Sequence, residues 1–224
     1  MQTLHYLQMQ ILRELLYKPN SRFSQLNISG LTSDHFTYHI QTLIDKGLVV
    51  NESGRYKLSV KGKEFANTMD TDRLQIEKQP KIGVMIIARN NGKYLVQQRL
   101  KEPYYGVYGF VTGKIRFGET INQTAMREFK EETGLSAKFE LRYILHEHVY
   151  NKDGDLLEDK IFFVIRASSI KGKLISTKEG KNSWISEQDY LKIEQKYYDE
   201  VDILNSFKNP EKPFVEKTYI IEQF

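Results

Sequence analysis

The stretch from residue 113 to residue 135 limits the fold of this chain most, because it combines a helix of defined ends with a cluster of acids. Residues 122–132 lack glycine and proline, and Gly134 stands where a helix ends, so the pattern predicts a helix over 122–132. At about 100° per residue, three glutamates share an arc of roughly 100°, and three apolar residues on the neighbouring arc are expected to face a core. The glutamates are Glu128, Glu131 and Glu132, and the apolar residues are Ala125, Met126 and Phe129.

Three carboxylates this close repel one another by a few tenths of a kcal/mol per pair on an isolated helix. A positive partner would stabilise them, and oxygen-only ligands select a hard cation such as Mg²⁺, Mn²⁺ or Ca²⁺ over zinc. Mg²⁺ also keeps waters and shares its coordination shell with substrate phosphates. The alternative is a solvated helix face, which is the commoner outcome for an isolated glutamate-rich turn.

The spacing of nine positions decides between these interpretations. A glycine is followed after five residues by a glutamate and, after seven more, by Arg-Glu-apolar-x-Glu-Glu-x-Gly-apolar. The nine positions are Gly113, Glu119, Arg127, Glu128, Phe129, Glu131, Glu132, Gly134 and Leu135. This pattern resembles the Nudix box, the signature of hydrolases that act on nucleoside diphosphates linked to another moiety.

The resemblance implies a hydrolase that uses Mg²⁺, with Mn²⁺ able to replace it. Glu128 and Glu132 are then the first-choice metal ligands, Glu131 shares the cluster, and the Gly113 carbonyl completes the shell. Glu179, on a later loop, is by the same resemblance a further ligand or base, the alternative being an exposed loop glutamate. Any of these carboxylates is a candidate for the general base.

The resemblance also assigns supporting roles in the catalytic site to Arg127 and Glu119, whose ion pair holds the box together. Arg127 is expected beside the acidic arc without being part of it. The chain departs from the family pattern before Gly113, where Val111 and Thr112 replace a frequent Pro-Gly. Thr112 adds a side chain where the backbone of the family approaches the metal or phosphate closely.

The composition of the chain indicates its class and its domain organisation. The chain has 224 residues, 40% of them hydrophobic, no cysteine and a net charge of +4. No apolar run approaches the roughly 18 residues of a membrane span, and the start does not resemble a signal peptide, so we expect a cytoplasmic protein without membrane contact. The polar segment 71–80 predicts a linker between a domain over 1–70 and a domain over 81–224.

The first domain is expected to run helix, short helix, helix, hairpin and helix. This order resembles a winged helix-turn-helix, with residues 36–49 as the recognition helix leading into the wing, and it implies contact with duplex DNA. Residues 1–72 hold eight Lys or Arg against seven Asp or Glu. A monomer should therefore bind DNA weakly, and useful affinity would require a homodimer. A role in protein contacts is the alternative.

The second domain is expected to contain several strands, with hairpin turns at Asn91-Gly92 and Asp153-Gly154. With the box helix and a helix over 198–208 they predict an α+β fold, an α/β/α Nudix-type sandwich with a mixed sheet, preceded by the small winged-helix domain. The expected strands cover 83–88, 94–99, 139–149, 160–166 and 214–221.

An aromatic segment precedes the box. Tyr104, Tyr105 and Tyr108 are candidates for stacking a nucleobase, and the alternative is a loop whose aromatic side chains pack on the core, as we expect for Phe110. Two functions follow. One is a hydrolase that cleaves the pyrophosphate bond of a nucleoside diphosphate derivative, and the other is a DNA-bound regulator that senses a nucleotide. The complete set of box carboxylates favours the hydrolase.

Overall fold

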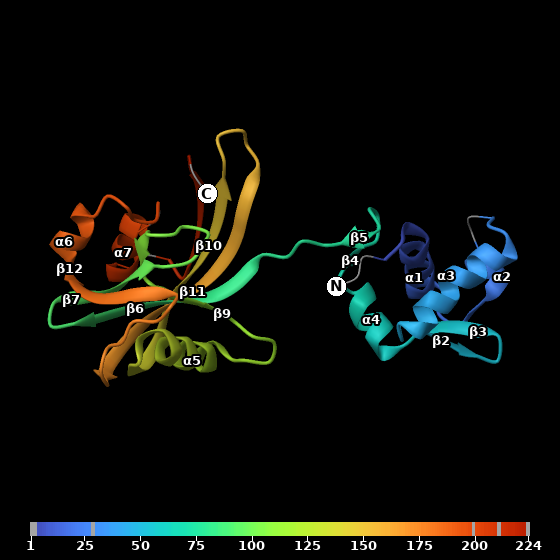
Figure 1. The fold of residues 1–224 in the computed structure, drawn as a ribbon, viewed down its shortest axis with the longest axis horizontal. Helices are drawn as coiled ribbons and strands as arrows, with labels where there is room; N and C mark the ends of the chain where they lie inside the picture. Colours follow the sequence, from blue (N-terminus) through green and yellow to red (C-terminus); the bar gives the residue numbers. More distant parts are fainter. Residues whose placement is uncertain (1–3, 28–29, 199, 210–211, 223–224) are drawn as a thin grey trace. The chain divides into compact units, whose positions relative to one another are not determined.

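The computed structural model describes residues 4–27, 30–198, 200–209 and 212–222. Contacts between residues divide the chain into two compact units, Met1–Lys78 (unit 1) and Gln79–Phe224 (unit 2), as Figure 1 shows. Unit 1 has one hydrophobic core and unit 2 has two, and each unit is described by itself.

The described part of unit 1 contains helices and two small antiparallel sheets. Its helices are α1 (Tyr6–Tyr17), α2 (Phe23–Leu26), α3 (Ser33–Asp45) and α4 (Val60–Ala66). Its strands are β1 (Ser21–Arg22), β2 (Val49–Glu52), β3 (Arg55–Leu58), β4 (Met69–Asp70) and β5 (Gln75–Ile76). The order in the first sheet is β1-β3-β2, and β4 pairs with β5.

One hydrophobic core holds unit 1 together. Leu12 and Leu15 of α1 and Leu43 of α3 are fully buried in it, as their helical spacing predicts. Leu74 is 8% exposed and belongs to the same core, and β5 folds back on β4. Unit 1 therefore takes up most of the segment that is expected as a linker over 71–80.

Unit 2 is built around one large sheet with helices on both sides. Its helices are α5 (Ile121–Thr133), α6 (Glu187–Lys192) and α7 (Glu200–Lys208). Its strands are β6 (Lys81–Asn90), β7 (Lys93–Arg99), β8 (Tyr108–Gly109), β9 (Val111–Lys114), β10 (Ser136–Tyr150), β11 (Leu156–Lys171), β12 (Gly180–Ser186) and β13 (Phe214–Ile220).

The sheet is mixed, which confirms the prediction. Its order is β12-β7-β6-β11-β10-β13, with β8 beside β7 and β9 beside β6. The pairs β6–β11 and β10–β13 are parallel, whereas β10–β11 and β7–β12 are antiparallel. The terminal strand, which has no assigned partner in the sequence, thus extends the sheet beside β10.

Unit 2 has two hydrophobic cores, one on each face of the large sheet. On one face, Ala125 and Phe129 of α5 pack with β6 residues such as Ile86. On the other face, Tyr190 of α6 and Leu204 of α7 pack on the sheet. Figure 1 shows α5 on one side of the strands and α6 with α7 on the other. The result is an α/β/α arrangement.

Local turn chemistry sets the hairpin between β6 and β7. Asn91 and Gly92 both have positive φ angles, 46° and 79°, as a two-residue hairpin turn requires. Gly154, with a φ of 86°, occupies the turn between β10 and β11. None of the helices in the described ranges has the length and apolar composition needed to cross a membrane.

Candidate active site

Both ends of the acidic helix α5 are fixed by local bonds. The Thr120 hydroxyl accepts a hydrogen bond from the Gln123 amide, and the Gln123 side chain accepts one from the Thr120 amide, which is a capping box. Gly134, with a φ of 74°, closes the helix in the left-handed conformation. The prediction that Met126 faces the core is wrong, because Met126 is 60% exposed and Thr124 is buried instead.

One pocket of about 670 Å³ brings the predicted carboxylates together. Glu128, Glu131 and Glu132 line it from α5, Glu179 lines it from the loop before β12, and Gly113 contributes backbone from β9. The sequence separates Glu179 from the helix by about 47 residues, whereas the fold places both at the same cavity.

Gly113 and Glu128 share a space that admits no further atom. A Cβ added at Gly113 would lie 2.0 Å from Cγ of Glu128 and 2.2 Å from its Cδ, so any other residue would displace the Glu128 side chain. Burial raises the pKa of Glu128, and the charges of Glu131 and Glu132 act in the same direction against the lowering effect of Arg127. A nearby cation would favour the charged form of this carboxylate.

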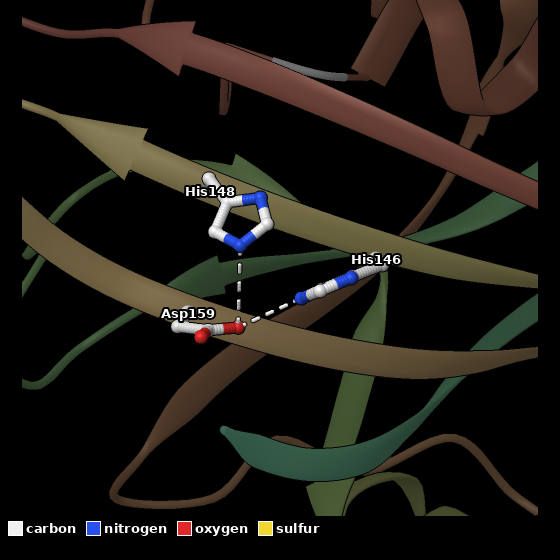
Figure 2. A group of neighbouring side chains, drawn as sticks. All are labelled: His146, His148 and Asp159. Atoms are coloured by element: carbon white, nitrogen blue, oxygen red, sulfur yellow. Dashed lines mark hydrogen bonds and ion pairs between the residues drawn. The ribbon is translucent and has the colours of Figure 1, made fainter. Parts of the chain in front are cut away.

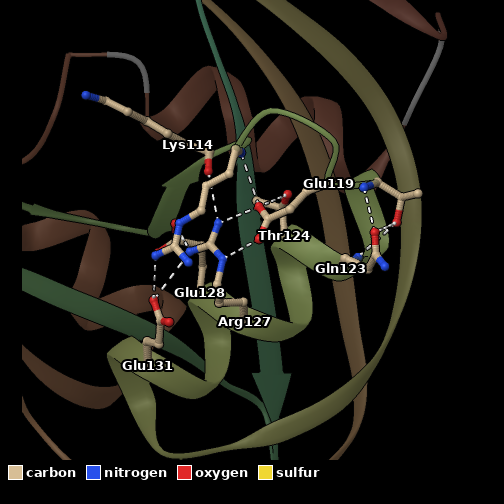
Figure 3. A network of polar contacts seen from close by, with 9 residues as sticks. Lys114, Glu119, Gln123, Thr124, Arg127, Glu128 and Glu131 are labelled. Atoms are coloured by element: carbon tan, nitrogen blue, oxygen red, sulfur yellow. Dashed lines mark hydrogen bonds and ion pairs between the residues drawn. The ribbon is translucent and has the colours of Figure 1, made fainter.

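Arg127 binds Glu119 through two parallel hydrogen bonds (Figure 3). Its Nε lies 2.6 Å from Oε1 of Glu119 and its Nη2 lies 2.7 Å from Oε2, the bidentate geometry of a strong charge pair. Nη2 also donates to the Lys114 carbonyl of β9 at 3.1 Å. Hydrogen bonds from Arg127 lower the pKa of Glu119 to about 2. These bonds hold the loop before α5 against the helix.

The guanidinium of Arg127 also contacts two glutamates of the acidic arc. Its Nη1 donates to Oε1 of Glu128 at 2.6 Å and to Oε2 of Glu131 at 3.3 Å. Hydrogen bonds to Glu119 and Glu128 raise the pKa of Arg127, so this residue stays charged. Arg127 therefore orients Glu128 directly, in addition to supporting the loop.

Three residues to which sequence patterns assign no role hold Glu132. Gln97 Nε2 donates to Oε2 of Glu132 at 3.2 Å, and the Thr177 hydroxyl donates to the same oxygen at 3.3 Å. Asn182, on β12, donates to the backbone carbonyl of Glu132 at 2.6 Å. Gln97 lies on β7 and Thr177 on the loop before β12. No local sequence pattern predicts the contact of either residue with Glu132.

Glu179 stands at the edge of the pocket. Its backbone carbonyl accepts a hydrogen bond from the Leu100 amide at 2.8 Å, which ties the loop to the end of β7. Its carboxylate forms an ion pair with Lys101, and its side chain is 36% exposed. Glu179 is thus accessible from solvent and faces the same cavity as the α5 carboxylates.

The structure separates the three candidate tyrosines. Tyr104 lines the pocket, its hydroxyl donates to Oε2 of Glu158 at 3.1 Å, and its ring packs edge-on against Tyr197. Burial raises the pKa of Tyr104, which keeps its hydroxyl protonated as a donor. Tyr105 is 63% exposed, and Tyr108 packs against the core on the α6–α7 side. Neither belongs to the lining of the pocket.

A buried charge cluster forms the part of the pocket on β6 and β11. Glu158 is 6% exposed and bonds to Lys81 at 3.1 Å and to Lys160 at 3.0 Å. Burial acts to raise the pKa of Glu158, but the two ammonium groups outweigh it, so this pKa lies below its ordinary value. Phe162 lies beside them in the lining. The parallel pairing of β6 with β11 brings Lys81 opposite Lys160, which sequence patterns do not reveal.

The oxygen donors of the pocket fit a hard divalent cation. The donor set is compact and consists of oxygen atoms alone. It combines the carboxylates on successive turns of α5 with the backbone of Gly113, which has no room for a Cβ beside Glu128. The chemistry of this set matches Mg²⁺ or Mn²⁺ better than zinc, which prefers nitrogen and sulfur ligands.

Fold and site together define an α+β domain whose acidic helix α5 lines one pocket together with Glu179 and the backbone of Gly113. A family model described as the NUDIX domain matches residues 77–206. The chain therefore belongs to the NUDIX domain family.

Individual relatives agree with this assignment. Over 87 residues the chain is 29% identical to an ADP-ribose pyrophosphatase of Methanocaldococcus jannaschii, covering 37% of this chain and 52% of that protein. The chain thus spans about half the length of this curated relative.

Solved structures show the same fold. A mutator MutT protein from Bacillus halodurans is 24% identical with a TM-score of 0.50, covering 63% of this chain and 90% of that chain. The NUDIX domain of NrtR from Shewanella oneidensis, in complex with ADP ribose, is 16% identical with a TM-score of 0.52, covering 67% of this chain and 98% of that chain. At these identities the likeness concerns the fold.

Proposed function

We propose that this chain is a Mg²⁺-dependent hydrolase that cleaves the pyrophosphate bond of a nucleoside diphosphate linked to another moiety. One observation carries the proposal: the carboxylates of α5 share a single pocket with Glu179, with the aromatic Tyr104 and with the cationic Lys81. A diphosphate needs charge neutralisation at phosphorus and a second surface that selects the organic part. This pocket offers both.

Glu128, Glu131, Glu132 and the Gly113 carbonyl would hold the metal, with Mn²⁺ as a substitute. The bound ion would neutralise phosphate oxygens and lower the pKa of a bound water. The metal ligands need fixed positions, because a small displacement of a reacting group is costly in rate. Arg127 fixes Glu128 by a direct hydrogen bond.

A carboxylate must also take a proton from the attacking water. Glu179 and the α5 glutamates all line the pocket, so each is a candidate for this proton transfer. Gln97 and Thr177 engage one oxygen of Glu132, which leaves its other oxygen for the metal or the proton.

The organic part of the substrate would lie towards Tyr104 and Phe162. Both aromatic side chains line the pocket, and base stacking on aromatic rings is largely independent of the base. Lys81 and Lys160 also line the pocket, and both are paired with Glu158, so only part of their charge is available to phosphate oxygens. ADP-ribose is the first probe, because one relative is named as a pyrophosphatase of this compound and one solved neighbour holds it.

A turnover panel tests the proposal. Nucleoside diphosphate derivatives, ADP-ribose among them, are incubated with the full chain in Mg²⁺, in Mn²⁺ and in EDTA, and released monophosphates are resolved by anion-exchange chromatography. At least one compound should be cleaved with metal and none in EDTA. Equal cleavage in EDTA, or no cleavage of any compound with either metal, would contradict the proposal.

A second candidate function rests on unit 1. The order α1, α2, α3, β2, β3 and α4 supports a winged helix-turn-helix, in which α3 would enter the DNA groove. Thr37, Tyr38 and Gln41 line an exposed hollow on α3 and offer polar contacts to base edges. In this case the NUDIX domain would sense a nucleotide for a DNA-bound regulator, with or without turnover. We rank it below the hydrolase.

A further inference from the structure

Two histidines and an aspartate meet on the long hairpin of β10 and β11, as Figure 2 shows. His148 lies directly opposite Asp159 in the antiparallel ladder, and His146 is two residues away on β10, so all three side chains share one face. Nε2 of His146 lies 2.9 Å from Oδ1 of Asp159, and Nε2 of His148 lies 3.9 Å from the same oxygen. Three ligand atoms from two strands therefore converge.

The spacing of these atoms suits a small metal ion. They lie within 4.8 Å of one another. A tetrahedral zinc ion with bonds of about 2.0 to 2.1 Å holds its ligand atoms roughly 3.3 Å apart, a value between the two observed distances. The side chains of His146, His148 and Asp159 are 18%, 29% and 31% exposed, so an ion can enter from solvent.

A fourth residue orients His146. Glu216 lies beside His146 in the parallel ladder of β13, and its Oε1 is 3.2 Å from Nδ1 of His146. A metal-bound histidine generally donates its other ring N–H to a carboxylate, which fixes the tautomer and aims the free lone pair at the metal. Both ring nitrogens of His146 lie within hydrogen-bond distance of a carboxylate, and the tautomer decides which of them donates. When the Nδ1–H donates to Glu216, the Nε2 lone pair faces a carboxylate oxygen of Asp159 and the two repel each other. A cation between these atoms turns that repulsion into attraction.

The cluster differs from the acidic pocket in place and in chemistry. Glu158, which precedes Asp159 in the strand, points to the opposite face and lines the pocket, whereas the pocket lining in the described part of the chain includes neither histidine. Imidazole with one carboxylate suits Zn²⁺, Fe²⁺ or Ni²⁺, whereas the all-oxygen pocket suits Mg²⁺. The two sites should therefore take different ions.

We propose that His146, His148 and Asp159 form a second, separate binding site for a divalent transition-metal ion, with Zn²⁺ as the reference ion. Glu216 positions His146, and a fourth coordination position stays open to water or a ligand. An ion in this site would also cross-link β10 and β11. Through Glu216 it would connect the terminal strand β13 to both of them. The competing explanation is an imidazolium at His146 that forms ion pairs with both carboxylates without any metal.

Metal titration of the full chain separates the two explanations. Mg²⁺ is kept in large excess to occupy the acidic pocket, and Zn²⁺ is added in a calorimeter while Co²⁺ is followed by its visible absorption. We expect one equivalent to bind in the wild type. Glu216→Gln should weaken binding about 10- to 100-fold, the usual effect of an orienting partner, and His148→Ala or Asp159→Asn should weaken it further.

Two variants serve as controls. His35→Ala removes an exposed histidine of unit 1, and Glu128→Gln alters the acidic pocket, so both should bind Zn²⁺ like the wild type. Fluorescence of Trp184, the only tryptophan of the chain and part of unit 2, checks that each variant is folded. Absence of Zn²⁺ uptake, or equal affinity in wild type and His148→Ala, would overturn the site in favour of the imidazolium. Because the readout is binding, loss of hydrolysis would not affect it.

Discussion

Single residues in the pocket depend on their neighbours for position. Gly113 leaves the space that Glu128 occupies, Arg127 bonds to both Glu128 and Glu119, and Gln97 holds Glu132 from a different strand. The carboxylates repel one another, so these contacts fix them where repulsion alone would spread them apart. The site is therefore preorganised by residues that need not touch the substrate.

Glu119 gives a prediction about pH. Hydrogen bonds from Arg127 lower its pKa from an ordinary 4.5 to about 2, so the ionised form is stabilised in the folded protein. Its contribution to stability is then fully present above pH 4.5 and is lost as the pH falls towards 2. The difference in unfolding free energy between wild type and Glu119→Gln should shrink across this window, measured by Trp184 fluorescence in urea. A difference that is constant with pH would contradict the pairing, and exposed Glu140→Gln is the matched control.

Tyr104 gives a prediction about recognition. Its ring lines the pocket, so Tyr104→Ala should weaken nucleotide binding by about 1 to 3 kcal/mol, the range for lost base stacking. Tyr104→Phe keeps the ring and loses the bond to Glu158, and Tyr105→Ala alters an exposed ring outside the lining. Both should bind more tightly than Tyr104→Ala in calorimetry. Unchanged affinity in Tyr104→Ala would place the base elsewhere.

Helices and strands show what local sequence predicts well. Gly134 ends α5 because glycine accepts a positive φ at little cost, and Asn91-Gly92 forms its turn for the same reason. The buried side of α5 is less predictable. Met126 is exposed and Thr124 buried, because packing on the sheet, rather than apolar character, decides which side of the helix faces inward.

The partners of the site were the least predictable part. Gln97 and Thr177 reach Glu132 from segments about 35 and 45 residues away, and no periodicity marks such contacts. The parallel pairing of β6 with β11, which brings Lys81 to Lys160, also has no local signal. The nine-position spacing of the box predicts which residues form the candidate site. The fold determines which side chains hold those residues in position.

The N-terminal cap of α5 gives a prediction about the stability of this helix. Thr120→Ala removes the side-chain half of the capping box and should lower the unfolding free energy of unit 2 by about 1 kcal/mol. Asn122→Ala, in the same exposed turn, should change it by less than about 0.5 kcal/mol. Urea unfolding followed by Trp184 fluorescence measures both. Equal stability of Thr120→Ala and wild type would show that packing alone sets the start of the helix.

The whole molecule joins a NUDIX domain to a second compact unit of different character. Unit 1 carries nearly balanced charge over 1–72, and its polar hollow on α3 includes the acids Asp34 and Asp45. Lys57 of the β2–β3 hairpin is paired with Glu52 at 2.6 Å, which reduces its value for phosphate contact. These charges limit what unit 1 can contribute to DNA binding as a monomer.

DNA binding is therefore predicted to be weak in the monomer. With Lys46, Arg55 and Lys57 as phosphate contacts, the slope of log K against log salt should be no steeper than about −3. Anisotropy titrations of labelled duplexes across a salt series, at concentrations where the oligomeric state is known, measure it. Tight binding by a demonstrated monomer, unaffected by Arg55→Ala and Lys57→Ala, would refute this account of unit 1.

The most direct test of the central claim is kcat in Mg²⁺ for Glu128→Gln and Glu132→Gln on a substrate that the panel identifies. If these residues hold the catalytic metal, each variant should lose at least about 100-fold in kcat, which is about 2.7 kcal/mol at the transition state. Trp184 fluorescence should show both variants folded, and Glu140→Gln should turn over like the wild type. Wild-type kcat in both Glu128→Gln and Glu132→Gln would contradict the assignment of the metal site.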